Sequence, residues 1–517
     1  MDSDSRTDDR CTIAAPSAIR TVAIIGAGLS GLVSAVHLLR AGINITIFER
    51  ANHVGGAWKY SPQPDRDPPF PSVRPPTPDW TEVERLQGEG LSYEEAALRF
   101  APPGPVYANM KSRGNKMAMR TSLVNWPDGS GDPLDHSEVL EYLQDVALTH
   151  RVQDKIRFHT RVEAVSKEEG TGHWQVRTSR LTTTTTSYKV DRETWRFDAV
   201  VVATGRYGVP RVPDVPGLST WKRMFPDRLM HAKQYRTPTS FRGKRVLIIG
   251  AFISALEIAR ELTDNGAMVY QSATDTRVDF RNKVGHKNAV EVAMVTEFVV
   301  FAQNRDEPSS GPKPLDDDQP IPGQVVLQDG RVLNEIHHVI IATGYLTTYP
   351  FLGPVLEQPF TSLEEADDKV VTTGDARTVH NLHEDIFYIP DPTLAFIGVT
   401  QFASTFSLYD FQAQVLAAVF AGRVRLPSEA SMKAEQRRRK SRVLPGTLLN
   451  SIFLLDDVVI RRSLDWVNKD LEAGGFEPLP GPDAEWWEAF REQREGSRSL
   501  LGMLQDNYLG QVQELPE

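Results

Sequence analysis

The sequence predicts an α/β protein with two Rossmann-like dinucleotide-binding folds, the second inserted into the first. Two glycine-rich segments, at residues 21–31 and 244–255, each follow the order strand, turn and helix. Each fold then closes with an apolar strand that runs into Ala-Thr-Gly, at Ala203–Gly205 and at Ala342–Gly344. Because the second segment starts after the first Ala-Thr-Gly element, and a further strand and helix follow the second, one fold must interrupt the other.

The first glycine-rich segment carries the complete dinucleotide-binding pattern. Gly26 permits the tight turn, Gly28 lets the backbone approach a pyrophosphate, and Gly31 lets the helix pack closely on the strand. Free N–H groups at the start of that helix favour an anion. Glu49 ends the next strand, where it can accept hydrogen bonds from a ribose diol. The full set argues against the alternative, a glycine-rich turn without a nucleotide.

Composition excludes several other classes of protein. The 517 residues suffice for two or three domains, and a net charge of -10 argues against a nucleic-acid surface. The single cysteine, Cys11, excludes internal disulfides and a cysteine-ligated metal, and we expect no metal site. The N-terminus lacks a signal-peptide pattern, and no stretch approaches the roughly 18 apolar residues of a membrane span. We therefore expect a cytoplasmic protein with no transmembrane anchor.

Domain boundaries are predicted from changes in composition along the chain. The order is a flexible leader (1–18), the first part of the first fold (19–214), the inserted fold (215–345), the second part of the first fold (346–480) and a C-terminal extension (481–517). Within the first part, residues 61–105 are rich in proline, which is incompatible with a continuous helix or a central strand. We interpret this insertion as a surface excursion that shapes a substrate entrance, or as an insertion without function.

Further motifs resemble those of one enzyme family. Two dinucleotide folds in one chain already suggest a flavoprotein that a nicotinamide reduces. The sequence adds Gly55–Trp58, a PTLAFIGV strand, an FQAQVLAAVFAG helix, and the motif FxGxxxHxxxY with Phe225, His231 and Tyr235 in place but Asp227 instead of glycine. From about residue 20 to about residue 430, the chain resembles the class B flavin-dependent monooxygenases, especially the branch that oxygenates nitrogen and sulfur.

The resemblance implies a specific chemistry. NADPH reduces FAD, O2 adds to the flavin to give a C4a-hydroperoxyflavin, and one oxygen atom passes to the nitrogen or sulfur of a small organic substrate, in specialised metabolism by our hypothesis. The expected partners are that substrate and O2, and the oligomeric state stays open. The expected FAD-binding residues are Gly26, Gly28, Ser30, Gly31, Glu49, Arg50, Gly56, Trp58 and Val162.

The second glycine-rich segment departs from the family pattern. Gly250 keeps the first glycine, but Phe252 stands at the second position, where a side chain points toward the expected pyrophosphate. Either the nicotinamide is displaced, or Phe252 turns away, or NADPH is not used. Ser254 can still offer its hydroxyl to a phosphate. Arg277 is the candidate for the 2′-phosphate or a solvated surface charge, and Asp275 nearby would favour NADH.

Three residues are candidates for the catalytic machinery. Where the family has an asparagine near the flavin, this chain has Arg113, with Asn115 two residues later. Arg113 facing the flavin would stabilise an anion and favour Baeyer-Villiger oxidation, whereas Asn115 brought there by a bulge would preserve heteroatom oxygenation. A purely structural Arg113 is the third possibility. His231 is either part of the catalytic machinery or a hydrogen-bonded histidine at a domain hinge.

Alternative functions follow from these departures. One is a Baeyer-Villiger monooxygenase, although related enzymes of that type carry Trp where Tyr235 stands. Others are an FAD oxidase or a non-redox flavin enzyme that has lost NADPH use, and a non-catalytic binding subunit. We expect the site between the two folds, with walls from residues 107–115 and 401–409. Phe402, Phe406 and Tyr409 are either an apolar substrate wall or ordinary core.

Overall fold

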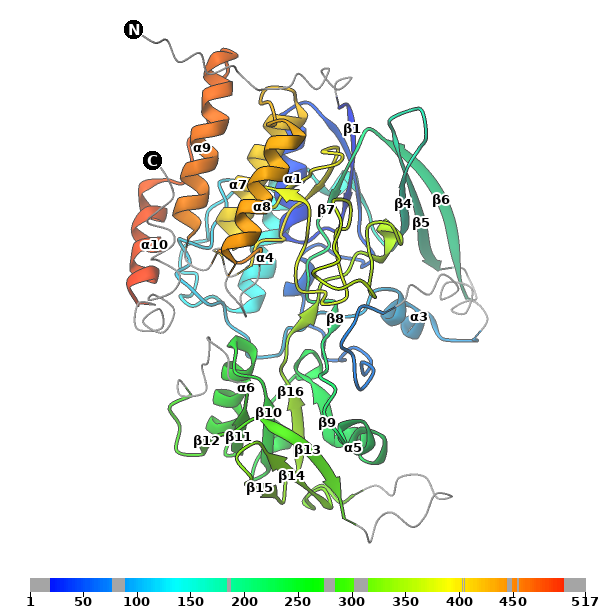
Figure 1. Cartoon of the computed structure of the whole chain (residues 1–517), viewed down its shortest axis with the longest axis vertical. Helices are drawn as coiled ribbons and strands as arrows, with labels where there is room; N and C mark the ends of the chain where they lie inside the picture. Colours follow the sequence, from blue (N-terminus) through cyan, green and yellow to red (C-terminus); the bar gives the residue numbers. More distant parts are fainter. Residues whose placement is uncertain are drawn as a thin grey trace.

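Two lobes lie one above the other along the long axis of the molecule (Figure 1). The computed structural model describes residues 19–76, 89–183, 187–273, 284–301, 315–401, 403, 405–443, 449–452 and 455–496. The predicted leader, the last part of the predicted C-terminal extension, and Asp275, Arg277 and Phe402 lie outside these ranges. We call the lobe with the larger sheet the first lobe and the other the second lobe.

A seven-stranded sheet forms the centre of the first lobe, in the order β18-β19-β20-β7-β1-β2-β3. Its strands are β1 (Thr21–Ile25), β2 (Asn44–Phe48), β3 (Ile156–Arg157), β7 (Ala199–Val202), β18 (Leu382–His383), β19 (Phe387–Tyr388) and β20 (Leu394–Phe396). β1 pairs in parallel with both β2 and β7. Residues on both sides of the inserted segment therefore build one sheet, which explains the return to the first fold predicted from sequence.

Alternate residues of β1 face two different layers, as the period of a strand requires. Val22 and Ile24 pack with helices α1 (Leu29–Arg40), α4 (His136–Thr149) and α7 (Thr405–Phe420). Ala23 and Ile25 pack with the antiparallel meander on the other face. The meander consists of β4 (Thr160–Lys167), β5 (Trp174–Thr183) and β6 (Tyr188–Phe197). The sheet is thus buried on both faces, and β1 is apolar throughout its last four residues.

The second lobe is a smaller Rossmann-like unit whose five-stranded sheet is parallel throughout, in the order β12-β11-β10-β16-β9. The strands are β9 (Leu229–His231), β10 (Arg245–Ile249), β11 (Met268–Ser272), β12 (Ala289–Val292) and β16 (His338–Ile341). Helix α6 (Ile253–Asp264) covers one face. The other face packs on α5 (Leu218–Met224) and on the sheet of β13 (Val295–Val300), β14 (Gly323–Leu327) and β15 (Val332–Asn334).

Two short antiparallel strands connect the lobes. β8 (Val209–Pro210) leaves the first lobe and β17 (Tyr345–Leu346) returns to it, and the two pair with each other. Figure 1 shows β8 between the lobes. The fold is therefore the predicted one, with the second dinucleotide-binding unit inserted into the first.

The proline-rich insertion is more structured than the sequence indicated. It contains helix α3 (Tyr93–Phe100), whose start is capped reciprocally by Ser92 and Glu95, a capping-box signal that the proline count obscured. Its earlier part bonds to the second lobe, since Asp65 pairs with the buried Lys233 at 2.5 Å and the Ser61 carbonyl accepts a hydrogen bond from Arg236. The described part of this insertion therefore ties the two lobes together.

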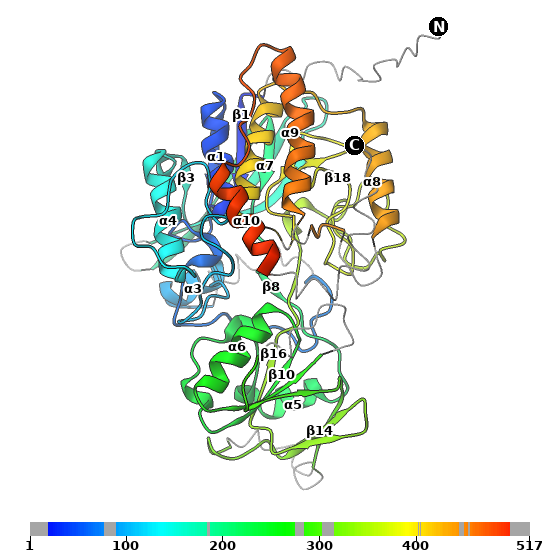
Figure 2. The same cartoon turned by 90° about the vertical axis from the view of Figure 1, so that its left-hand side faces the viewer.

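The C-terminal helices pack on the first lobe. They are α8 (Glu429–Arg442), α9 (Asp456–Ala473) and α10 (Ala484–Gly496), and Figure 2 shows α9 beside α7. Trp486 and Phe490 of α10 are buried in the main core, with their rings stacked at 4.9 Å. The predicted extension thus contributes to the core. Among the helices that the structure describes, none is long and apolar enough to cross a membrane.

Candidate cofactor and substrate site

One cavity of about 1980 Å³ opens between the lobes and reaches both glycine-rich turns. A pocket for one drug-sized ligand has a volume of roughly 300–1,000 Å³. The cavity lining includes Gly28 from the first turn, Gly250 from the second, and Gly344 beside the connecting strands. Its size and lining suit two nucleotides and a small substrate together.

The three positions of the first turn require glycine for different physical reasons. A Cβ on Gly31 would overlap the carbonyl oxygen of Gly26, and a Cβ on Gly26 would lie 2.6 Å from the carbonyl oxygen of Ala203. The fold itself therefore requires these two glycines. A Cβ on Gly28, in contrast, would lie 3.6 Å from its nearest neighbour, the Cα of Gly56, which is ordinary contact. Gly28 lines the cavity, so its missing side chain leaves open the space that a pyrophosphate needs.

The helix start beside Gly28 suits an anion. Gly28 is the N-cap of α1, no side chain caps this end, and the first turn carries no acidic residue. The free N–H groups and the helix dipole therefore favour a negatively charged ligand. These residues fit the pyrophosphate of FAD.

Glu49 is held in place for a ribose. Its two carboxylate oxygens accept hydrogen bonds from the backbone N–H groups of Ala27 at 2.7 Å and Ala51 at 2.8 Å. The side chain is buried, yet it lines the cavity, so the remaining lone pairs can accept bonds from ribose hydroxyls. The other expected FAD residues that line the cavity are Gly26, Ser30, Arg50, Gly56, Trp58 and Val162. Gly31 lies behind the turn, where it serves packing.

The second turn accommodates Phe252 without backbone strain. Phe252 is the N-cap of α6 with φ -104° and ψ -172°, close to the φ -79° and ψ -170° of Gly28. Its ring is half-buried against the cluster between α6 and the second sheet. The start of α6 also has no side-chain cap and no acidic residue in its first turn. Gly250, Phe252 and the exposed Ser254 all line the cavity, so the start of α6, like that of α1, borders the shared space.

Arg113 and Asn115 have different surroundings. Arg113 lines the cavity and forms an ion pair with Glu257 of α6, across the two lobes. Burial, followed by the nearby Arg260 guanidinium, lowers the pKa of Arg113. Asn115 is not among the residues that line the cavity, and its Oδ1 accepts a hydrogen bond from the N–H of Met117 at 2.8 Å. This geometry gives Asn115 a local role in its turn and Arg113 a role between the lobes.

His231 is fully buried beside the connecting strands. Its Nε2 donates to the carbonyl of Gly344 at 3.0 Å, and its Nδ1 accepts from the N–H of Lys233 at 3.1 Å. This pair of bonds fixes the neutral tautomer. Burial lowers the pKa of His231 to about 3 against the opposing effect of the Gly344 bond. Both ring nitrogens are committed to backbone groups, which favours the hinge interpretation over proton transfer.

Several cavity residues carry no strong sequence signal. Gln493 and Arg494 of α10 line the cavity, although they lie in the C-terminal extension. Arg494 pairs with Asp457 of α9 at 3.1 Å. Gln493 and Arg494 reach the cavity because Trp486 and Phe490 pack α10 on the core, and only the tertiary structure reveals this. In the sequence, the helical spacing of Trp486 and Phe490 was the one feature that could have predicted a helix packed on the core.

The expected substrate walls are partly correct. Tyr107, Met110 and Tyr409 line the cavity. Tyr409 donates its hydroxyl to the carbonyl of Thr400 at 2.7 Å. Phe406 has no exposed surface and belongs to the core beneath, so it is not a wall residue.

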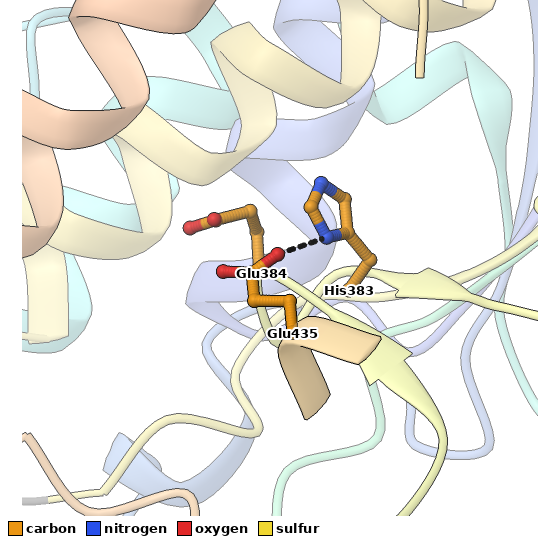
Figure 3. A group of neighbouring side chains, drawn as sticks. All are labelled: His383, Glu384 and Glu435. Atoms are coloured by element: carbon orange, nitrogen blue, oxygen red, sulfur yellow. Dashed lines mark ion pairs between the residues drawn. The ribbon is translucent and has the colours of Figure 1, made fainter. Parts of the chain in front are cut away.

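Figure 3 shows a separate cluster of His383, Glu384 and Glu435. None of the three residues lines the cavity. The three potential ligand atoms lie within 4.8 Å of one another. His383 Nδ1 pairs with Glu435 at 3.1 Å, and Arg462 pairs with Glu384 at 2.7 Å. Arg462 also lies 3.8 Å from Glu435, so both carboxylates have a basic partner, and the pairs join the end of β18 to helices α8 and α9. The cluster is therefore explained as a structural ion-pair network.

The fold and the cavity together are those of a protein with two Rossmann-like dinucleotide-binding units that share one cavity. Comparisons with known proteins agree. A family model described as flavin-binding monooxygenase-like matches residues 105–307 and 321–449, and a model for an NAD(P)-binding Rossmann-like domain matches residues 24–72. Residues 24–72 contain the first glycine-rich turn, α1 and β2, so the second match supports a Rossmann-like fold in the first lobe and does not show where a nicotinamide binds.

Individual relatives point the same way. Flavin-containing monooxygenase ustF2 of Aspergillus flavus is 33% identical over 93% of this chain and 98% of its own length. Flavin-containing monooxygenase iboF of Amanita muscaria is 29% identical over 82% of this chain and 83% of its own length. The solved structure of S-allyl-L-cysteine S-oxygenase from Allium sativum has a TM-score of 0.66 at 24% identity and covers 93% of each chain, which supports the fold.

The chain belongs to the flavin-binding monooxygenase-like family and is a flavin-dependent monooxygenase. Membership supports FAD and NADPH as its cofactors, and a small organic molecule and O2 as its substrates.

Proposed function

We propose that this protein uses NADPH to reduce FAD and then transfers one oxygen atom of O2 to the nitrogen or sulfur of a small organic substrate, in specialised metabolism. The observation that carries the proposal is that both glycine-rich turns open into one cavity. A hydride can pass directly between two cofactors only if their reactive rings meet, and a shared cavity allows this. FAD, when bound, supplies the oxygen-transfer chemistry.

The protein's own residues would bind and enclose the reactants. The N–H groups at the starts of α1 and α6 would hold the two pyrophosphates, with Gly28 and Ser254 at the respective turns. Glu49 would accept hydrogen bonds from the ribose of FAD. Tyr107 and Met110 of the first lobe, with Gln493 of α10, would exclude water from the substrate region.

The surroundings of Arg113 bear on the Baeyer-Villiger alternative. That reaction would benefit from a free cation directed at an anionic flavin adduct. Arg113 instead pairs with Glu257, which offsets its charge. This contact favours heteroatom oxygenation over the Baeyer-Villiger reaction as the proposed function.

The proposal is tested by product analysis. The FAD-loaded protein is incubated with NADPH, isotope-labelled O2 and a matched set of one tertiary amine, one sulfide and one ketone. Transfer of one labelled oxygen atom to the amine or the sulfide supports the proposal. If only the ketone reacts and the product is an ester, the protein is a Baeyer-Villiger monooxygenase. If a substrate is oxidised but its product contains no labelled oxygen, the protein is an oxidase.

A further inference from the structure

Four arginines of the cavity lining form no ion pair with any carboxylate in the part of the chain that the structure describes: Arg50, Arg206, Arg211 and Arg377. Arg50 is an expected FAD residue, and the guanidinium of Arg206 donates to the carbonyls of Val399 and Thr400, which leaves Arg211 and Arg377. Other cations of the same lining do have acidic partners: Arg113 pairs with Glu257, and Lys233 with Asp65. Arg211 follows β8 in the connection between the lobes, and Arg377 lies in the segment that returns to the first lobe. The cavity thus has two guanidinium groups available for a ligand.

The positive charges of Arg211 and Arg377 repel each other, and together they attract an anion. Burial first, and then the guanidinium of Arg377, lower the pKa of Arg211, and no acidic group offsets either effect. The acid nearest to Arg377 along the chain, Asp375, accepts bonds from the Thr373 hydroxyl at 2.9 Å and from the backbone N–H of Arg377 at 3.5 Å. The acid nearest to Arg211 along the chain is Asp214, which also lines the cavity but forms no ion pair with Arg211. Arg211 is half-buried and Arg377 is exposed. An anion placed between the two like charges relieves their repulsion and gains charge-assisted hydrogen bonds.

Backbone contacts hold both arginines in position without using their side chains. The N–H of Arg211 donates to the Gly344 carbonyl at 2.9 Å, and its own carbonyl accepts from the Thr343 hydroxyl at 2.6 Å. The carbonyl of Arg377 accepts from Gln401 Nε2 at 3.2 Å. Neither guanidinium forms an ion pair within the described ranges, so both are available to a ligand there, and their replacement should leave the local fold intact.

We propose that Arg211 and Arg377 form a subsite for one anionic group of a ligand, either a carboxylate of the substrate or a phosphate of the nicotinamide nucleotide. A guanidinium group can bind the oxygens of either group in a bidentate manner. The subsite goes beyond the proposed function, because it concerns binding and does not depend on oxygen transfer.

Binding equilibria of the FAD-loaded protein test this subsite. The flavin absorbance spectrum is followed while the protein is titrated with methylthioacetate, with the uncharged methylthioacetamide, and with NADP+, none of which requires turnover. The variants are Arg211→Gln, Arg377→Gln and Arg377→Lys. The control is Arg331→Gln, which removes an exposed arginine that pairs with Asp329 outside the cavity lining.

The proposal predicts that both glutamine variants bind one of the two anions at least about tenfold more weakly, because a charge-assisted contact is lost. The amide should bind as before, Arg377→Lys should retain part of the affinity, and Arg331→Gln should resemble wild type. Weaker methylthioacetate binding alone assigns the subsite to a substrate carboxylate, and weaker NADP+ binding alone assigns it to a nucleotide phosphate. If the glutamine variants and wild type bind both anions equally, or if wild type binds neither, the subsite does not exist.

Failure of the oxygen-transfer reaction would leave these equilibria untouched. A protein that binds the anions through Arg211 and Arg377 but oxygenates nothing would refute the proposed function and support the subsite. The reverse result would refute only the subsite.

Discussion

Arg113 of the first lobe forms an ion pair with Glu257 on helix α6 of the second lobe. The pair joins the loop where the family places a flavin-side asparagine to the helix whose start would bind the nicotinamide. Both side chains keep about a third or more of their surface exposed, at 40% and 32%. The pair therefore contributes to the relative position of the lobes with only a small energy.

We predict that Arg113→Gln and Glu257→Gln have similar effects and that the double variant is no worse than either. An exposed pair contributes about 0.2–1 kcal/mol, so flavin reduction by NADPH should slow by no more than about fivefold. A double-mutant cycle on the reduction rate measures the coupling. Lys116→Gln, in the same loop and bonded to the Ser130 carbonyl, serves as the charge-matched control. A severe loss for Arg113→Gln alone would show that Arg113 acts on the reacting groups.

The glycines of the first turn should separate into two classes. Gly28→Ala should fold normally, because its Cβ meets only Gly56 at 3.6 Å, but it should bind FAD at least about tenfold more weakly, because the methyl group occupies the pyrophosphate space. Gly31→Ala should lose about 3 kcal/mol or more of stability, since its Cβ overlaps the Gly26 carbonyl. FAD titration and thermal unfolding distinguish the two. If Gly28→Ala bound FAD with normal affinity, this turn would not be the binding site for the FAD pyrophosphate.

Phe252→Gly tests whether the altered second turn limits nicotinamide binding. Because the Phe252 ring packs into the second lobe and its backbone matches that of Gly28, we expect the affinity for NADPH to change by no more than about threefold. Stability should fall by roughly 1–2 kcal/mol through lost packing and the flexibility of glycine. Both quantities come from NADPH titration and thermal unfolding. A large gain in NADPH affinity would show that the phenyl ring obstructs the site.

His231 should make the protein less stable in acid. Its pKa falls from 6.5 in the unfolded chain to about 3 in the fold, so at intermediate pH the unfolded state binds more protons. The stability associated with neutral His231 is therefore complete above pH 6.5 and is lost progressively as the pH falls toward 3. At pH 5 the loss is roughly 2 kcal/mol.

The measurement for His231 is the pH dependence of unfolding. His231→Gln should be less stable than wild type at pH 8, since it loses buried hydrogen bonds, but its stability should decline less between pH 7 and pH 5. His338 and His380, whose pKa values burial lowers to about 4, contribute equally to both proteins. Equal slopes in the two proteins would contradict the buried, neutral state of His231.

The fold could be predicted well from short sequence patterns, because each glycine-rich turn is determined by residues that are close together in the chain. Gly26, Gly28 and Gly31 lie within six residues of one another, and the Ala-Thr-Gly elements end apolar strands, so short-range spacing sufficed for the α/β class and the insertion. Helix α3 was missed because prolines on both sides outweighed the Ser92 and Glu95 cap.

Long-range contacts account for what the sequence did not reveal. Arg113 and Glu257 are far apart in the chain, and neither residue has a local signal for the other. The same holds for Arg211 and Arg377, which come from different segments, and for Gln493, which reaches the cavity only because α10 docks on the core. Arg277 lies outside the described residues, so the choice between NADPH and NADH stays a prediction.

The most direct test of the central claim is an anaerobic stopped-flow experiment, in which the FAD-loaded protein is mixed with NADPH and separately with NADH, and O2 is then added. The account predicts rapid bleaching of the flavin, faster with NADPH, followed on O2 addition by the absorbance of a flavin–oxygen adduct that an added amine or sulfide discharges. A flavin that neither nucleotide bleaches would contradict the account and would favour an FAD enzyme that does not use a nicotinamide.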